Sequence, residues 1–499
     1  MENNKKFIDQ EKKMLPTEKL KISEFLIQCW TALCISFLGC QSGYISSWPS
    51  YTMAVFASNE TVLSMPMSSM HISLLGSLSN VGALLISPFC SYAFNTYGRK
   101  YATVLFALPF VLAWTIVSIS SNVYLVLLAM ALVGIGISGQ NVAVIFISEI
   151  AHDSIRGGLS ACPATGYFLG LLISNFLCGH LTYNQVVYTF LSSSVLAVVL
   201  LLLLKESPVY LVVVGREKEA AKSIAFYKRL DETSKEVETE ISKIKQQLDP
   251  RLEPLLQGGY EPVAANELVT AKEPAQVAKR ISSWSFLKNS KSSQSSLFKM
   301  LGLMTITSMM GPVLLQVYGE SIFKEAVPSL DPNQCSVGVG FVFLTASIVC
   351  ILAVDRCGRQ CLLVYTAIGS GLCSLIMGTV LQFHWAPDWF TALMIYGYCF
   401  SYTMGCATIP FVLMAEVFLP EVRSFCNTIT MLTLWIANFI TLGSFTFLVE
   451  MMGMGPVFYM YAVMCCVVAV YSAFCIPETK GLSMTEIQKL FVKDKPLKK

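Results

Sequence analysis

The chain has few charged residues. Only 13% of its 499 residues are Asp, Glu, Lys or Arg, whereas 54% are hydrophobic, and the mean hydropathy is +0.59. An ordinary soluble core cannot hide that much apolar surface. The composition therefore excludes a soluble globular protein and predicts an all-α protein that spans the lipid bilayer many times.

The motifs of several chemical classes are also missing. The sequence contains no GxxxxGK[ST] phosphate loop, no HExxH, no GxSxG and no paired-cysteine motif, so hydrolysis of nucleotides or peptides has no support. The 17 cysteines lie mostly inside apolar runs, which indicates packing and not a disulfide framework. We therefore expect no enzyme, no cofactor, no metal site and no nucleic-acid partner, and no motif points to a protein partner.

Charge is absent from the middle of every apolar run, where no Asp, Glu, Lys, Arg or His is found. Carriers that couple transport to ions or protons usually place such a group inside the membrane. This absence favours movement of a solute down its own gradient over proton symport.

Long apolar runs are what the sequence does contain. A span needs roughly 20 mostly apolar residues, and twelve runs meet that need, near 25–45, 71–94, 101–119, 123–147, 158–182, 186–204, 299–319, 336–354, 361–382, 391–415, 425–449 and 456–476. The predicted organisation is an amino-terminal tail over 1–24, a six-helix bundle over 25–204, a cytoplasmic loop over 205–298, a second six-helix bundle over 299–476 and a carboxyl-terminal tail over 477–499.

Basic residues predict the orientation of the chain. Lysines are concentrated in both tails, whereas Lys324 is the only basic residue on the predicted outer loops. Because loops rich in Lys and Arg stay in the cytoplasm, both termini are predicted to be cytoplasmic. The only N-x-[ST] sequon, at Asn59, falls in the first outer loop and agrees with glycosylation at the plasma membrane.

Clusters of opposite charge recur in the two halves. Glu149 closes an apolar run and Arg156 opens the next one, and Glu416 and Arg423 repeat that spacing. Each charge opposes the dipole of its own helix, so we expect the charges to pair with one another. Such a belt would tie the two halves together on the cytoplasmic side and would break when the inside opens, whereas the simpler alternative is a set of solvated interface charges. With two matching turns upstream, the predicted cytoplasmic gate comprises Arg99, Glu149, Arg156, Asp355, Arg359, Glu416 and Arg423.

Three segments interrupt the apolar pattern. Span 1 contains the polar, glycine-rich sequence 39–44, which marks either close helix packing or the wall of a cavity. Span 10 contains Gly405 and Pro410, and a proline there bends the helix. Span 11 carries Trp435 and Asn438 one turn apart, which could stack on and hydrogen-bond a polyol, although a packing Trp and a helix-bridging Asn fit the pattern nearly as well.

The central loop has two parts. Residues 215–247 read as charged amphipathic helix, and residues 249–296 are rich in Pro, Ser and Lys, which predicts disorder. The serines there are candidates for phosphorylation, although linker composition alone explains them.

Together, these motifs resemble the sugar porter family of the major facilitator superfamily, and within it insect trehalose- and glucose-transporter-like members. The resemblance rests on both pairs of turns and on the sequences Glu206-Ser207-Pro208 and Pro477-Glu478-Thr479-Lys480-Gly481. It implies two six-helix bundles, a cytoplasmic helical domain after span 6 and alternating access around a central sugar site.

The chain departs from that family in the sugar pocket. Positions where the family has amides align with Ala164, Thr307, Ser308, Val313 and Phe343, and the acidic or polar residue of span 10 aligns with Thr403, whereas Tyr318, Trp435 and Asn438 match. Gln41 stands where proton-coupled members have Asp, which supports uniport. Unpaired sugar hydroxyls cost ~1–3 kcal/mol each, so we expect weak binding of a hexose or a preference for a less polar solute.

The resulting prediction is a facilitative carrier of a hexose, trehalose or a similar small solute. The candidate solute-binding residues are Gln41, Thr307, Ser308, Gln316, Tyr318, Thr403, Trp435 and Asn438. Two alternatives remain open at this point: a non-transporting sensor or degenerate paralogue that signals through 205–298, and a carrier of a less polar organic solute.

Overall fold

The computed structural model describes residues 21–152, 155–247, 290–418 and 420–480, with isolated positions between 284 and 288 and between 482 and 491. Within this part of the chain every regular element is a helix. A helix satisfies all of its backbone hydrogen bonds internally, which the interior of a bilayer requires.

The first half forms six long helices. We call the end of the bundle at which Ile22 lies the inner end and the opposite end the outer end. Helices that begin at the outer end start after polar capping residues, such as Asn122, whose side chain accepts a hydrogen bond from the amide of Tyr124 at 2.9 Å. The six helices are α2 (Ile22–Ala57), α3 (Ser69–Tyr97), α4 (Arg99–Ile119), α5 (Val123–Ile150), α6 (Arg156–His180) and α7 (Tyr183–Leu203).

The second half also crosses the membrane six times, but two of its spans are broken. The seventh span comprises α14 (Lys291–Ser308) and α15 (Pro312–Val317), with α16 (Gly319–Ala326) following at its outer end, and the tenth comprises α19 (Asp388–Met404) and α20 (Ile409–Val417). The unbroken spans are α17 (Pro332–Cys357), α18 (Arg359–Phe383), α21 (Pro420–Met452) and α22 (Met454–Cys475).

The breaks account for the count of spanning helices. In the described residues, ten helices are long and apolar enough to cross a membrane, and the two broken spans bring the total to the twelve that the sequence predicts. The break at Gly405 was predicted from Gly405 and Pro410. The break in the seventh span occurs at Gly311, whose φ of 97° is accessible to glycine at little cost.

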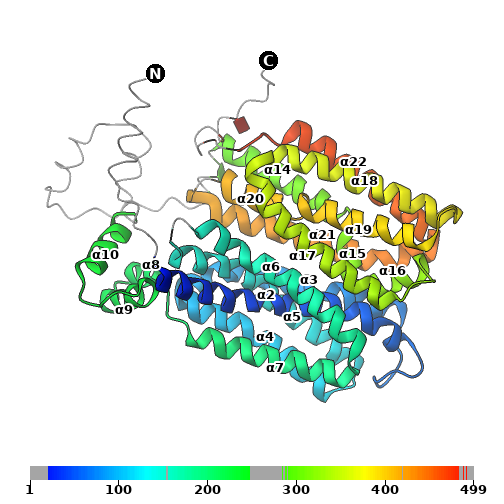
Figure 1. Ribbon diagram of the computed structural model, residues 1–499, viewed down its shortest axis with the longest axis horizontal. Coiled ribbons are helices and arrows are strands. Elements are labelled where there is room, and N and C mark those ends of the chain that lie inside the picture. Colours follow the sequence, from blue (N-terminus) through cyan, green and yellow to red (C-terminus); the bar gives the residue numbers. More distant parts are fainter. Residues whose placement is uncertain are drawn as a thin grey trace.

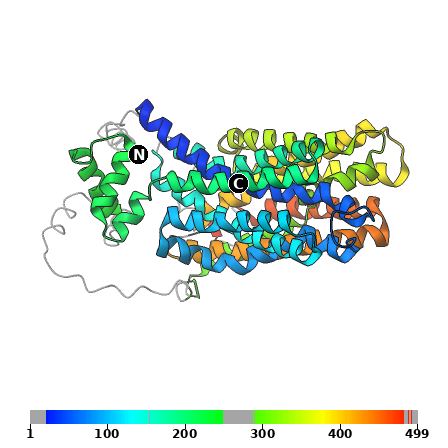
Figure 2. The same ribbon diagram turned by 90° about the horizontal axis from the view of Figure 1, so that it is seen from below.

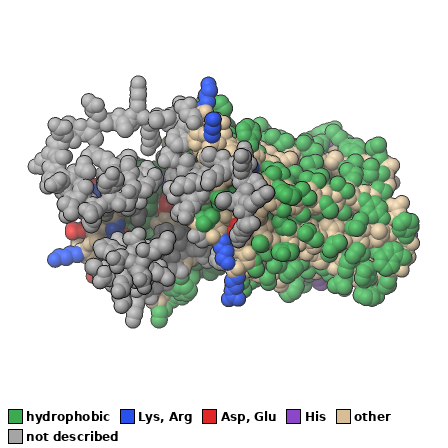
Figure 3. Space-filling model, turned by 90° about the horizontal axis from the view of Figure 1, so that it is seen from above, with side chains coloured by type: hydrophobic (Ala, Val, Ile, Leu, Met, Phe, Trp, Pro, Cys, Tyr) green, Lys and Arg blue, Asp and Glu red, His purple; other side chains and the backbone are tan. Residues whose placement is uncertain are grey.

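The two halves lie side by side as separate bundles (Figure 1). They meet along two seams, one where α3 packs against α21 and one where α6 packs against α17. Exposed apolar side chains such as Leu85, Tyr365 and Phe474 cover the outside of the helices, and Figure 3 shows hydrophobic side chains over most of one face of the bundles. That surface suits a surrounding bilayer.

A small helical domain follows the first bundle and lies at one end of the molecule (Figure 2). It comprises α8 (Pro208–Val213), α9 (Glu217–Lys228) and α10 (Lys235–Gln247), which pack around their own apolar core, including Leu211, Ile224 and Val237. Helices therefore form where the charged amphipathic pattern predicts them. The segment predicted to be disordered falls mostly outside the described residues.

Candidate functional site

An ion pair joins the inner ends of two helices in the first half. Arg99, at the start of α4, contacts Glu149, at the end of α5, with an Nη2–Oε1 distance of 2.8 Å. The hydroxyl of Ser207 donates to Oε2 of the same carboxylate. Glu206 accepts hydrogen bonds from the backbone amides of Arg99 at 2.8 Å and Lys100 at 3.0 Å, so a carboxylate caps the positive end of α4.

The second half repeats this arrangement residue by residue. Arg359, at the start of α18, contacts Glu416, at the end of α20, with an Nη2–Oε1 distance of 2.8 Å. The hydroxyl of Thr479 donates to Oε2 of Glu416 at 2.6 Å. Glu478 accepts from the amides of Arg359 at 2.8 Å and Gln360 at 3.0 Å. The sequences Glu206-Ser207 and Glu478-Thr479 therefore perform the same task in the two halves.

We call these two clusters the inner clamps. They consist of Arg99, Glu149, Glu206 and Ser207 in the first half and of Arg359, Glu416, Glu478 and Thr479 in the second. Each clamp pairs charges that would be unfavourable at the ends of their own helices. The Arg99 and Glu149 side chains are only 14% and 12% exposed, so the pair is partly shielded from water and salt. Burial raises the pKa of Glu206, while hydrogen bonds from the amides of Lys100, Ser207 and Arg99 act in the opposite direction. The carboxylate is thus held by backbone donors that only a folded turn can supply.

The prediction that these charges tie the two halves together is wrong for the two ion pairs that the structure describes. Arg99 and Glu149 both belong to the first half, and Arg359 and Glu416 both belong to the second. Each arginine follows a tight turn between two helices of its own bundle. That turn places the guanidinium beside the end of another helix of the same bundle, α5 in the first half and α20 in the second.

The other gate candidates add little to this picture. Arg423, in α21, donates from Nε to the carbonyl of Phe418 at 3.2 Å. Arg156 and Asp355 lie at helix ends, but their side chains fall outside the described set.

Hydrogen bonds across the seams connect the two halves instead. The phenol of Tyr167 in α6 donates to Oε1 of Gln316 in α15 at 2.5 Å. Nearer the outer end, Asn175 in α6 donates to the carbonyl of Ser336 in α17 at 2.8 Å. At the other seam, the indole of Trp435 in α21 donates to Ser87 in α3 at 3.1 Å.

Gln41 does not occupy the position expected of a solute-binding residue. It is completely buried, and its amide bonds Ser193 at 2.9 Å and Ser194 at 2.8 Å, both in α7. The surrounding glycines serve helix packing, since a Cβ on Gly43 would collide with the backbone of Tyr167. Of the two interpretations of segment 39–44, close packing is therefore the one that the structure supports at Gln41.

Three further candidates use their hydroxyls within the second half. Thr307 and Ser308 each donate to the carbonyl of Met304 one turn earlier, at 3.2 Å and 2.8 Å. Tyr318 donates to the carbonyl of Leu442 in α21 at 3.1 Å. These contacts are structural, and no unused hydrogen donor remains on these three side chains.

Two candidates each have a fully buried polar atom that forms no hydrogen bond with the described residues. The Oγ1 of Thr403 and the Oδ1 of Asn438 are buried and have no partner among the described residues. Leaving a polar atom buried and unpaired costs about 1–3 kcal/mol. Such atoms need an explanation, and a bound polar solute would supply one.

Sequence reasoning missed Tyr167, Ser207 and Thr479 as functional candidates. The two hydroxyl residues follow Glu206 and Glu478 directly, so the repeat of an acid followed by a hydroxyl was an available signal. Tyr167 gave no signal, because its partner lies 149 residues away in sequence.

Two features lie on the outer side of the molecule. Asn59, two residues after the end of α2, is exposed. Glu320 lies just beyond the seventh apolar run, where its amide donates to Ser50 of the first half at 2.8 Å. Burial raises the pKa of Glu320 to about 7; nearby Lys324 opposes this rise, and Asp331 adds to it.

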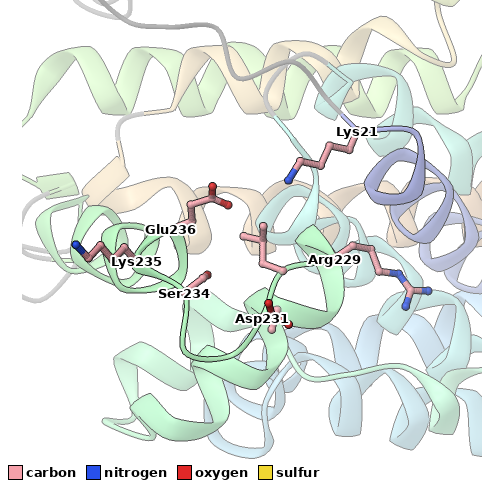
Figure 4. Close-up of a pocket in the computed structure, with 8 residues that line it drawn as sticks. Lys21, Arg229, Asp231, Ser234, Lys235 and Glu236 are labelled. Carbon is pink, nitrogen blue, oxygen red and sulfur yellow. The ribbon is translucent and has the colours of Figure 1, made fainter.

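A pocket of about 600 Å³ lies away from the seams, where the start of α2 meets α9 and α10. Lys21 and Glu236 point toward each other across it, while Arg229 and Lys235 point away (Figure 4). Its basic groups do not converge, so the pocket offers no evident anion site.

Two six-helix bundles, joined by seams and braced by matching inner clamps, define a transmembrane carrier of the major facilitator type. The sequence profile of the family described as "Sugar (and other) transporter" matches residues 31–491. The chain belongs to this family, and it is a transporter and not an enzyme.

Relatives and solved structures agree with this assignment. The chain is 24% identical over 474 residues to the facilitated trehalose transporter Tret1 of Polypedilum vanderplanki, covering 93% of this chain and 87% of that one. It is 25% identical to a Tret1-2 homolog of Drosophila simulans, covering 95% and 93%. In fold it is similar to the xylose transporter XylE of E. coli in a partially occluded inward-open conformation, with a TM-score of 0.71, 19% identity and coverage of 91% and 99%.

Proposed function

We propose that this protein is a facilitative carrier that moves trehalose, a hexose or a similar small solute by rocking of its two bundles. Membership of the sugar transporter family supports this function, and relatives named as facilitated trehalose transporters point to the solute class. The absence of charge from the middle of the spans favours transport down a gradient.

The observation that carries the proposal is that two of the predicted solute-binding residues each have a buried polar atom with no partner among the described residues, Thr403 Oγ1 and Asn438 Oδ1. They come from spans 10 and 11 of the second half, and hydroxyl groups of a sugar can donate to both. Gln316 and Trp435, which contact the first half through hydrogen bonds, complete the proposed set. Gln41, Thr307, Ser308 and Tyr318 are better explained by helix packing.

In this proposal the inner clamps brace each half so that it moves as a rigid body. The clamps leave the seams free to open, because neither ion pair crosses between halves. Arg156, Asp355 and Arg423 are proposed to assist at the same inner ends.

The cellular setting belongs to the same proposal. We place the carrier in the plasma membrane with both termini in the cytoplasm, which puts the exposed Asn59 outside, where it can be glycosylated. The proposed boundaries of the bundles, loop and tails are those given by the sequence.

Uptake of labelled trehalose and glucose into vesicles containing the purified protein tests the function. We expect saturable uptake that stops when the gradient is spent and does not require a proton gradient. Binding without flux would favour a sensor, although family membership does not favour that alternative. Flux of apolar solutes alone would favour the less polar cargo.

A further inference from the structure

One hydrogen bond crosses between the halves near mid-membrane, and a residue outside the predicted site donates it. Tyr167 lies eleven residues after the start of α6, about 16 Å along the helix at 1.5 Å per residue. That distance is roughly half the thickness of the hydrocarbon core. Its partner Gln316 lies in α15, the short helix that follows the break in the seventh span.

The bond fixes the orientation of the Gln316 amide. A phenol hydroxyl that donates at 2.5 Å needs an acceptor, so it holds the Oε1 side of the amide. No group among the described residues accepts from the Nε2 side, and Nε2 is not one of the sealed polar atoms without partners. Gln316 is nevertheless 7% exposed. Within the described part of the chain, the two N–H donors of the amide therefore have no acceptor, and the side chain is not sealed off completely.

The neighbours of Tyr167 come from several spans. Ser46 of α2 and Tyr402 of α19 both lie near the phenol. Tyr402 precedes Thr403, whose Oγ1 lacks a partner. Groups from both halves thus lie around this single bond, and they include the phenol rings of Tyr167 and Tyr402.

We propose that Tyr167 is a positioning residue that orients Gln316, so that its N–H groups face an acceptor oxygen of the transported solute. This inference rests on the proposed function and adds to it a residue that determines how the solute is bound. The solute presents a hydroxyl or ether oxygen to Gln316 and an apolar C–H face to the phenol rings, as a sugar or glycoside does.

The test is a double-mutant cycle on transport of labelled trehalose and glucose by purified protein in vesicles. Tyr167→Phe keeps the ring and removes the donor, which frees the amide to turn. We expect KM to rise about 3- to 10-fold with Vmax largely retained, the scale of one hydrogen bond. Gln316→Leu gives at least as large a rise, and the double variant is no worse than Gln316→Leu because the two residues act through one contact.

Tyr396→Phe is the matched control. Its phenol donates to the carbonyl of Cys335 at 3.2 Å inside the second half, so its loss should leave KM unchanged. A purely structural role of Tyr167 would lower Vmax or the yield of folded protein without raising KM. A KM for Tyr167→Phe within twofold of the wild type, or additive effects in the double variant, would overturn the inference while leaving the proposed function intact.

Failure of the proposed function gives a different result. If the wild type transports neither sugar, the same variants are compared by thermal shift with a panel of sugars and glycosides, since a bound solute stabilises the folded state. A shift that Tyr167→Phe reduces supports the inference. Equal shifts in both proteins, or no shift in the wild type with any solute, overturn it.

Discussion

At the scale of single residues, the most informative atoms are the hydroxyls that complete the inner clamps. Ser207 and Thr479 donate to Glu149 and Glu416 in matching positions of the two halves. Each hydroxyl adds a donor to a carboxylate that is already paired with an arginine in a partly buried place, and Oε2 of Glu149 also accepts from Nε of Arg99 at 3.0 Å. A hydrogen bond to a charged group contributes more than one between neutral groups, about 1.5–3 kcal/mol.

Removing these hydroxyls should destabilise the protein by similar amounts in both halves. We expect Ser207→Ala and Thr479→Val each to lower the free energy of unfolding by about 1–3 kcal/mol, measured by thermal unfolding of purified protein. Ser242→Ala is the control, because that serine is exposed and bonds only within its own helix. Variants as stable as this control would show that the hydroxyls are dispensable.

Glu320 should make stability depend on pH. Its pKa is raised from 4.5 to about 7 in the folded protein, so the carboxyl is neutral in both states at low pH. As the pH rises from about 5 to about 8, the unfolded state ionises first and the folded state loses stability.

The melting temperature of the wild type should therefore fall over that range, and Glu320→Gln should fall less. Glu325→Gln, at an exposed position one turn further on, should follow the wild type. If the melting temperatures of the wild type and of Glu320→Gln changed in parallel with pH, the pKa of Glu320 would not be raised in the folded protein.

Residue identity and spacing predicted some of the site but not the rest. Arg99 and Glu149 could be paired from sequence because sign and spacing recur in the second half. The role of Gln41 could not, because the rotation of α2 is set by its contacts with α6 and by the serines of α7, which lie about 150 residues away. A polar residue in an apolar run therefore indicates a contact, but not whether that contact is with a solute or with another helix.

At the scale of elements, the tight turns before α4 and α18 determine where the clamps form. Gly98 and Gly358 have φ values of 93° and 87°, and a Cβ on either would meet the carboxylate that caps the following helix. The glycines thus provide both the turn and the space for Glu206 and Glu478.

Substituting Gly98 or Gly358 should destabilise the protein by more than backbone strain alone. Gly453 also has a positive φ, of 82°, but a Cβ there meets nothing within 4 Å, so Gly453→Ala measures backbone strain, about 1–3 kcal/mol. We expect Gly98→Ala and Gly358→Ala to lower the unfolding midpoint further than Gly453→Ala does. Equal shifts in all three variants would mean that the carboxylates adjust freely.

Broken helices show what sequence could and could not predict for elements. Gly405 and Pro410 marked the break in the tenth span, because proline cannot continue the backbone ladder. The break in the seventh span occurs at Gly311-Pro312, a comparable signal that the apolar run around it concealed. The count of twelve spans was nevertheless predictable, because a break shortens the individual helices but leaves the apolar run in the sequence intact.

At the scale of the whole molecule, the structure describes two braced bundles that meet along two seams. The inner clamps lie within each bundle, whereas the bonds of Tyr167, Asn175 and Trp435 cross between bundles. A few such bonds cost little to exchange, which suits halves that rock on a thermally accessible path. The ion pairs of the clamps should then persist during transport, whereas hydrogen bonds across the seams should break and re-form.

Distances between spin labels test this central claim most directly. One pair replaces the exposed residues Tyr101 and Tyr365 near the inner ends of the two halves, and a second replaces Tyr188 and Trp389 near the outer ends. A third pair, at Tyr92 and Tyr101, reports within one half. On addition of a transported sugar, the account predicts opposite changes in the inner and outer pairs and no change in the third. Distances that stay fixed in all pairs, or a third pair that moves as much as the first, would contradict it.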